Sequence, residues 1–330
     1  MGSQTKFVGY FTLFALIALM PVLGAYPVFV MKALCFALFA CAFNLMIGFG
    51  GLLSFGHAAF FGAAAYASGY AMKMWGFPTP IGLLFGALAG AALGLVFGLL
   101  AIRRSGIYFT MITLALAQMV YFIFLQAPFT GGEDGLQSVP RGSFFGIDLS
   151  SDIQLYYVVA VLFTAGFWLI HRVVHSPFGQ VLKAIRENEP RAISLGYEVD
   201  RFKLLAFVLS AALAGLAGAI KTTVLGFATL TDLLWTTSGA VVLMTLVGGM
   251  GTLVGPILGA VLIISLENKV GDLGTGLANL TGIEWFNSLG ESVQIVTGLI
   301  FVLCVLLFRR GIVGEADALA AAMNGKATKH

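Results

Sequence analysis

Apolar stretches of about twenty residues follow one another along almost the whole chain. A helix of about 20 residues crosses a bilayer core about 30 Å thick, so each stretch has the length of one crossing. Charged residues make up only 10% of the chain, against roughly 25% in an average soluble domain. Because so few charges cannot cover a water-exposed surface, the sequence predicts an all-α polytopic membrane protein.

The pattern predicts about ten transmembrane helices, with both termini on the cytoplasmic side. Lys and Arg in short loops concentrate on the cytoplasmic side of a membrane, and this orientation places most of the 18 Lys and Arg residues there. The two segments around residue 251 are weak, which leaves eight crossings plus re-entrant hairpins as the alternative. The predicted spans are 7–25, 28–49, 53–71, 80–102, 107–126, 153–171, 204–225, 237–250, 253–267 and 292–308.

Glycines interrupt this pattern at residues 48–51 and 248–251. Broken backbone at membrane depth is tolerated only where protein covers it or where it lines a polar cavity. Polar side chains beside the breaks are therefore candidates for a substrate path. In the alternative interpretation, Ser54 caps the following helix and His57 is a hydrogen-bonded interior histidine. The substrate-path candidates are Asn44, Ser54, His57 and Thr245.

A glycine recurs at every fourth residue of the span 80–102, from Gly82 to Gly98. Residues four apart lie on the same side of a helix, and small residues there allow the backbone of another helix to approach closely. The stripe therefore predicts a tightly packed helix pair.

The predicted cytoplasmic loop 172–203 is the most highly charged part of the chain. Its apolar residues at 178, 181, 182 and 185 have helical spacing and predict a short amphipathic helix along the membrane surface. Pro190 starts a second short helix, which Gly196 can end. Such a helix fits a groove on a cytoplasmic partner. The candidate anchors for this contact are Ile193, Leu195 and Tyr197.

Four stretches, in this order, resemble motifs of one transporter family. They are Gly51-Leu-Leu-Ser-Phe-Gly-His-Ala-Ala-Phe-Phe-Gly62, Thr130-Gly-Gly-Glu-Asp-Gly-Leu136, the segment 176–220 and Val247-Gly-Gly-Met-Gly-Thr-Leu-Val-Gly-Pro256. The sequence is similar to the branched-chain amino acid ABC transporter permeases, in particular to the LivM-like branch. The resemblance covers most of residues 30–310.

The resemblance implies half of the translocation pathway of an ATP-driven importer in a bacterial inner membrane. It implies a single transmembrane permease domain over residues 1–311, a cytoplasmic tail over 312–330 and a periplasmic loop over 127–152. The loop 172–203 then couples the permease to the ATPase, and the coupling residues that the resemblance implies by position are Glu187, Glu189, Arg191, Ala192, Ile193, Leu195, Gly196 and Tyr197. The implied partners are a second homologous permease, two cytoplasmic ATPase subunits, a periplasmic solute-binding protein and membrane lipid, without nucleic acid.

The sequence itself contains no phosphate loop of the G-x-x-x-x-G-K-[ST] type, so ATP hydrolysis is expected in a separate chain and not in this one. The cysteines at 35, 41 and 304 lie in apolar segments without metal-site spacing. We therefore expect no catalytic residues, no metal and no cofactor. Two alternatives remain for the transport function, namely a permease for urea or short amides in the same importer class and a stand-alone secondary carrier.

Overall fold

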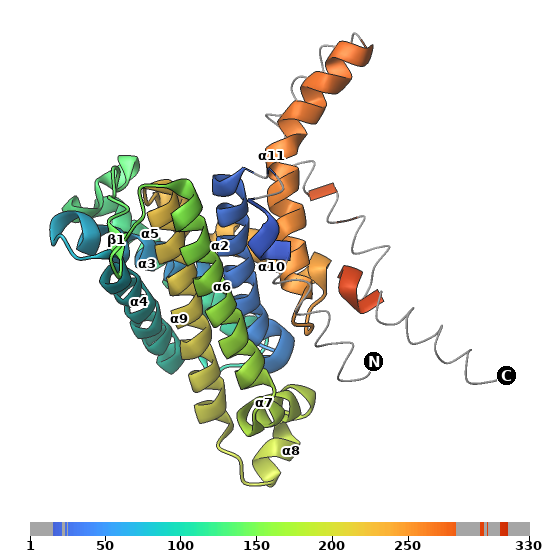
Figure 1. Ribbon diagram of the computed structural model, residues 1–330. Helices are drawn as coiled ribbons and strands as arrows, with labels where there is room; N and C mark the ends of the chain where they lie inside the picture. Colours follow the sequence, from blue (N-terminus) through green and yellow to red (C-terminus); the bar gives the residue numbers. More distant parts are fainter. Residues whose placement is uncertain are drawn as a thin grey trace.

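The computed structural model describes residues 16–21, 24, 26–281, 298–299, 302 and 311–315. These residues form mostly long helices that pack side by side (Figure 1). The numbered α-helices are α2 (Pro27–Asn44), α3 (His57–Met74), α4 (Thr79–Ala101), α5 (Ile107–Gln126), α6 (Asp152–Val174), α7 (Pro177–Glu187), α8 (Glu189–Ser194), α9 (Val199–Leu225), α10 (Trp235–Gly248) and α11 (Gly255–Thr281).

Five segments of the described chain are long and apolar enough to cross a membrane. They are α4, α5, α6, α9 and the continuous segment Pro27–Phe49, which contains α2, and α10 is a shorter apolar helix. The multi-pass helical architecture is thus confirmed. The count of ten crossings stays a prediction, because the spans 7–25 and 292–308 and both termini lie largely outside the described residues.

Two predicted spans differ from the observed helices at their ends. Helix α9 begins at Val199, before the predicted start at residue 204, and α11 continues to Thr281, well past the predicted end at residue 267. In both places charged residues marked the predicted boundary. Charge ends an apolar stretch but does not end a helix, because Glu and Lys are good helix formers.

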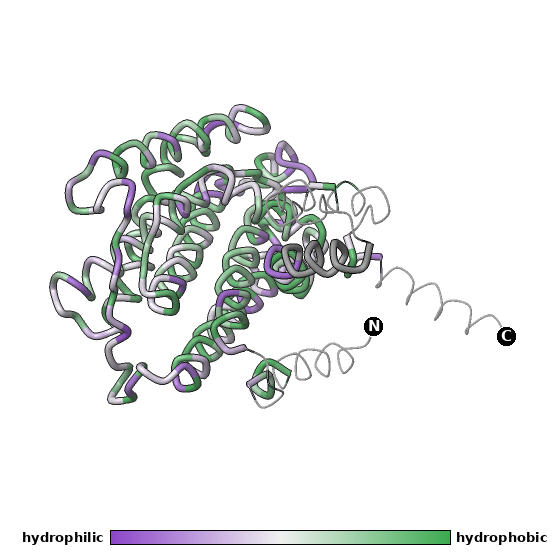
Figure 2. The backbone as a smooth tube through the Cα atoms, turned by 90° about the horizontal axis from the view of Figure 1, so that it is seen from above, coloured by the Kyte–Doolittle hydropathy of each residue, from purple (hydrophilic) through white to green (hydrophobic). Residues whose placement is uncertain are grey.

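The centre of the bundle consists of α2, α3 and α9, most of whose residues are buried, whereas α4 and α5 expose much of their apolar surface. Figure 2 shows that hydrophobic residues predominate along the long helices, including the outer ones. Exposed apolar side chains such as Leu88, Met111 and Phe122 fit a helix face that contacts lipid.

The glycine stripe packs α4 against α9, as predicted. A Cβ atom at Gly90 would lie 2.6 Å from the carbonyl oxygen of Ala211 and 3.0 Å from the Cα atom of Gly215. A Cβ atom at Gly215 would in turn lie 2.8 Å from the carbonyl oxygen of Gly86. The two backbones therefore touch, and no side chain fits between them.

Both predicted glycine breaks are present. Helix α2 continues into a π-helical turn, η1 (Leu45–Phe49), and α3 begins only at His57. The second break lies between the end of α10 at Gly248 and the start of α11 at Gly255. Each helix pair is thus interrupted where glycines cluster in the sequence.

The loop 127–152 lies at the opposite end of the bundle from α7 and α8 (Figure 1). It contains the 3-10 turns η2 (Pro128–Thr130) and η3 (Gly132–Asp134) and a hairpin of β1 (Ser143–Phe144) and β2 (Ile147–Asp148). Leu136 and Ala228 exchange two backbone hydrogen bonds of 2.9 Å, which attach this loop to the segment that follows α9.

Candidate functional site

A cavity of about 910 Å³ lies among α2, the end of α9, the segment that follows it, α10 and α11. Its volume is in the range of small-molecule sites, about 300–1,000 Å³. Four ionisable side chains, Lys32, Lys221, Asp232 and Glu267, line a wall that is otherwise largely apolar and hydroxylated. Small organic molecules bind in such sites, where a few polar groups interrupt an apolar surface.

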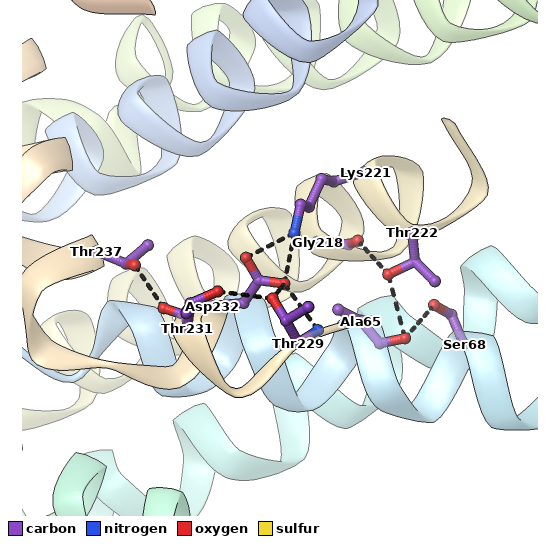
Figure 3. A network of polar contacts seen from close by, with 9 residues as sticks. All are labelled: Ala65, Ser68, Gly218, Lys221, Thr222, Thr229, Thr231, Asp232 and Thr237. Carbon is purple, nitrogen blue, oxygen red and sulfur yellow. Dashed lines mark hydrogen bonds and ion pairs between the residues drawn. The ribbon is translucent and has the colours of Figure 1, made fainter. Parts of the chain in front are cut away.

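Lys221 and Asp232 form a buried ion pair at this cavity (Figure 3). The ammonium nitrogen of Lys221 donates to both carboxylate oxygens of Asp232, at 2.7 and 2.6 Å. Only 7% of the Lys221 side chain and 8% of the Asp232 side chain are exposed. The Lys221 ammonium also lies 5.4 Å from the ring centre of Phe227. Two charges are therefore held at the edge of an apolar bundle, each neutralised by the other.

Local sequence explains why these two residues meet. Gly226, with φ of 77°, ends α9 and turns the chain back. The 3-10 turn η4 (Leu230–Leu233) follows, and Thr229 and Asp232 form its capping box, in which the Asp232 carboxylate accepts from the backbone N–H of Thr229 at 3.4 Å. The turn thus directs Asp232 towards Lys221, which lies one helical turn before the end of α9.

Asp232→Ala is expected to destabilise the protein strongly, because it leaves the buried Lys221 ammonium without a partner. Removal of one member of a buried ion pair costs about 3–5 kcal/mol. Thermal unfolding in detergent measures the effect. Glu198→Ala provides the control, since the Glu198–Arg201 pair is exposed and should leave the unfolding temperature nearly unchanged. Equal unfolding temperatures of the two variants would contradict the prediction.

A second pair of opposite charges, Lys32 of α2 and Glu267 of α11, lines the same cavity. The two residues interact electrostatically, and neither is fully buried. The cavity thus contains two cationic and two anionic side chains, whose charges cancel. Sequence analysis assigned no role to any of the four. One sequence pattern could have predicted the Lys221–Asp232 pair. These two opposite charges lie in an apolar region on either side of Gly226, a residue at which the chain can reverse its direction.

Asn44, a predicted substrate-path residue, connects the two helix breaks. Its side-chain oxygen accepts from the N–H of Gly251 at 2.9 Å, and its side-chain nitrogen donates to the carbonyl oxygen of Thr252 at 2.7 Å. Thr245 is fully buried, and its hydroxyl donates to the carbonyl oxygen of Val241 within α10 at 2.9 Å. Both side chains contact protein, and neither lines the cavity.

Ser54 and His57 are also fully buried. The Ser54 hydroxyl accepts from the N–H of Gly56 at 3.1 Å, directly before α3. His57 Nε2 lies 2.9 Å from the hydroxyl oxygen of Ser210 in α9, and aromatic rings surround the imidazole. A hydrogen-bonded interior histidine matches the alternative interpretation of His57, whereas Ser54 bonds within its own turn and does not cap α3, whose N-cap residue is Gly56. Sequence analysis missed Ser238 of α10, whose hydroxyl accepts from the Ala58 N–H at 2.9 Å at the start of α3.

The two short helices predicted in the loop 172–203 are confirmed as α7 and α8. The Ser176 hydroxyl caps α7, the Asn188 side chain caps α8, and Gly196, with φ of 87°, follows α8. Lys203 of α9 pairs with Glu189 at 2.5 Å and fixes α8 against α9. Among the predicted contact residues Ala192 is buried and Glu189 is half-buried, whereas the exposed ones are Glu187, Arg191, Ile193, Leu195, Gly196 and Tyr197.

Helix α7 packs on the first helix break. The guanidinium of Arg186 donates to the carbonyl oxygen of Gly48, and the Lys183 ammonium lies 5.6 Å from the ring centre of Phe49. Gly51, with φ of 71°, leaves room for the Arg186 side chain, because a Cβ atom there would lie 2.9 Å from Arg186 Cγ. Through Asn44 the same break is bonded to the second one. Loop 172–203 and both breaks therefore form one connected cluster.

Comparison with known proteins identifies a match over most of the chain. Residues 28–308 match the model of a family described as branched-chain amino acid transport system / permease component. The chain is 28% identical over 245 residues to the high-affinity branched-chain amino acid transport system permease protein LivM of Salmonella typhimurium, a match that covers 67% of this chain and 58% of that protein. The LivM protein of Escherichia coli matches to the same extent.

Other relatives carry different names. The chain is 32% identical over 208 residues to the ribose import permease protein RbsC of Bacillus subtilis, covering 59% of this chain and 58% of that one. The chain therefore spans less than two thirds of the length of each of these relatives. Among solved structures, PsaBC from Streptococcus pneumoniae in complex with Fab aligns with a TM-score of 0.39 at 14% identity, over 84% of this chain and 89% of that one.

Proposed function

The chain belongs to the family of branched-chain amino acid transport system permease components, and from this membership we propose that it is the membrane subunit of an ATP-driven importer of branched-chain amino acids. The observation that carries the proposal is the charge-lined cavity among the helices of an apolar bundle. A membrane protein keeps ionisable groups at such a place for function, because they are costly to bury.

In this proposal the cavity belongs to the outer half of the translocation pathway. On the orientation predicted from the basic residues, α9 runs from the cytoplasm outwards, which puts Lys221 and Asp232 near the external surface. The loop 127–152, on the same side, is bonded to Ala228 between α9 and η4. A solute-binding protein that docks on this loop would release its cargo beside the cavity.

The cytoplasmic loop supplies the proposed contact with the ATPase. Ile193, Leu195 and Tyr197 are apolar or aromatic, more than 40% exposed, and close together at the tip of the loop. A short helix with exposed apolar anchors fits a groove on a protein partner. Movement of α8 would reach the membrane helices through the Lys203–Glu189 pair and through α7.

The full importer in this proposal contains a second permease, two ATPase subunits and a periplasmic solute-binding protein, in a bacterial inner membrane. The second candidate cargo is a sugar, since RbsC is named for ribose import. In this proposal the permease switches between outward and inward access when the ATPases bind ATP.

Deletion of the gene is expected to abolish ATP-dependent uptake of labelled leucine, isoleucine and valine by intact cells, and complementation should restore it. Uptake of labelled ribose in the same strains tests the second candidate, and uptake of proline serves as the control for general membrane integrity. Normal uptake of all three branched-chain amino acids in the deletion strain would contradict the proposed cargo, and failure to co-purify with an ATPase would contradict the importer class.

A further inference from the structure

We propose that the cavity at Lys221 and Asp232 is itself a binding site for a zwitterionic α-amino acid with an apolar side chain. The Lys221–Asp232 pair opens and re-forms with the ligand, so that Lys221 binds the carboxylate and Asp232 binds the ammonium group. This inference rests on the proposed transport function and names the chemistry with which the membrane subunit holds its cargo.

Charge balance is the first argument. The wall of the cavity contains Lys32, Lys221, Asp232 and Glu267, two charges of each sign. A buried charge without a partner is costly, so a ligand with one net charge would leave one side chain uncompensated. When a zwitterion binds, the Lys221–Asp232 pair is replaced by two pairs, one between Lys221 and the ligand carboxylate and one between Asp232 and the ligand ammonium group. No charge is then left unpaired. A sugar or urea offers no charge for this exchange.

The second argument is that Asp232 is held in place more firmly than Lys221. Asp232 is fixed, because its carboxylate also accepts from the N–H of Thr229 at 3.4 Å and from the Thr229 hydroxyl at 3.3 Å. Lys221 is the more mobile of the two, because both hydrogen bonds that its ammonium group makes to described residues go to Asp232. A lysine ammonium on its four-carbon chain can move to a ligand carboxylate, whereas Asp232 keeps its place for an ammonium group.

The third argument is the apolar part of the wall. Leu225, Trp235, Val242 and Leu243 line the cavity together with aromatic side chains from α2 and the first break. Two hydroxyl groups of the same wall lie at the ion pair, since the Thr229 hydroxyl donates to the Asp232 carboxylate at 3.3 Å and lies 2.7 Å from the Thr231 hydroxyl. An amino acid with a branched aliphatic side chain presents the same division, with its charged end towards Lys221 and Asp232 and its apolar end towards Trp235.

Trp235 provides a direct readout of binding. The importer complex is purified in lipid nanodiscs and titrated with leucine, without nucleotide and without the solute-binding protein, while tryptophan fluorescence is recorded. We expect a saturable change that Trp235→Phe removes. Isoamylamine lacks the carboxylate and 4-methylpentanoate lacks the ammonium group, and each should bind at least about tenfold more weakly than leucine, because each leaves a polar partner unpaired. Ribose should produce no change.

The variant test neutralises the pair without leaving a lone charge. Lys221→Met combined with Asp232→Asn is expected to raise the dissociation constant for leucine at least about tenfold, because it removes two charge-assisted hydrogen bonds. The matched control, Arg201→Met with Glu198→Gln, neutralises an exposed pair at the other end of α9 and should leave the constant unchanged. The ligand series on the unmodified protein tests the same site independently of how these variants fold.

Three outcomes overturn the binding site, namely equal affinity for leucine and its singly charged analogues, a response to ribose, or an unchanged dissociation constant in the Lys221–Asp232 double variant. If labelled leucine is taken up by cells while the titration shows no binding, the proposed transport function stands and the site is wrong. If leucine changes the fluorescence of Trp235 while leucine uptake is normal in the deletion strain, the binding site stands and the proposed importer function is wrong.

Discussion

In the proposed importer, Arg186→Ala is expected to lower uptake at least about tenfold while the protein still folds and binds the proposed ATPase, since coupling between sites is typically worth a factor of about 5–150. Arg186 is the residue of α7 that donates to the backbone at the first break, through the carbonyl oxygen of Gly48. Without this bond, movement of the cytoplasmic loop is no longer transmitted to the residues between α2 and α3.

The effect is expected to reach the second break as well. Asn44, just before η1, bonds to both Gly251 and Thr252, so the two breaks move together. Leu182 of α7 adds packing, since its methyl groups would lie 3.7 Å from a Cβ atom at Gly50. Arg186 also lies beside the second break, since a Cβ atom at Gly251 would lie 3.5 Å from its guanidinium nitrogen and 3.3 Å from the carbonyl oxygen of Gly48.

Uptake and ATP hydrolysis should be measured together in proteoliposomes that contain the complete importer. Arg186→Ala should retain ATPase activity and lose uptake, which is the signature of uncoupling. Arg201→Ala is the control, because Arg201 is exposed in the same loop and pairs with Glu198, its neighbour on the same helix. Full uptake by Arg186→Ala, or loss of the assembled complex, would show that Arg186 has no coupling role.

Gly90→Val is expected to prevent the protein from accumulating in a folded form. The Cβ atom of any larger residue would lie 2.6 Å from the carbonyl oxygen of Ala211 and 3.0 Å from the Cα atom of Gly215. Both obstacles are backbone atoms, which cannot rotate away. The two helices would have to separate, and overpacking costs about 1–3 kcal/mol and more where, as here, the obstacle is backbone.

Size-exclusion chromatography of a fluorescent fusion, extracted in detergent, measures the fraction that is folded. Gly239→Val is the matched control, because no atom lies within 4 Å of a Cβ placed at Gly239 in α10. We expect a single symmetric peak for Gly239→Val and aggregate for Gly90→Val. A symmetric peak of normal height for Gly90→Val would show that α4 and α9 do not need this close contact.

The sequence was most informative where one local property decides the structure. The glycine stripe predicted that another helix packs closely on the span 80–102, because glycine spacing sets how closely a helix can be approached, and the structure identified that helix as α9. Pro190 and Gly196 predicted the position of α8 through the backbone angles that these residues prefer. Clustered glycines likewise predicted both helix breaks.

The candidate site could not be predicted in the same way. Asn44, Ser54, His57 and Thr245 were selected because polar residues beside a break either line a path or bond to protein, and sequence does not distinguish these two environments. The structure surrounds all four with protein. The start of α9 and the end of α11 differ from the predicted boundaries, because charge marks the edge of an apolar stretch and not the end of a helix.

The sequence by itself determined that the chain lies in lipid, that it is helical and that two helix pairs are interrupted. Hydropathy, residue spacing and the positions of glycines are local properties of the chain. Only the tertiary structure brought Lys32, Lys221, Asp232 and Glu267 to one cavity, and Arg186 to the carbonyl group of Gly48. The physical reason is that an ion pair or a backbone contact depends on distance in space, and helices from distant parts of the chain set that distance when they pack.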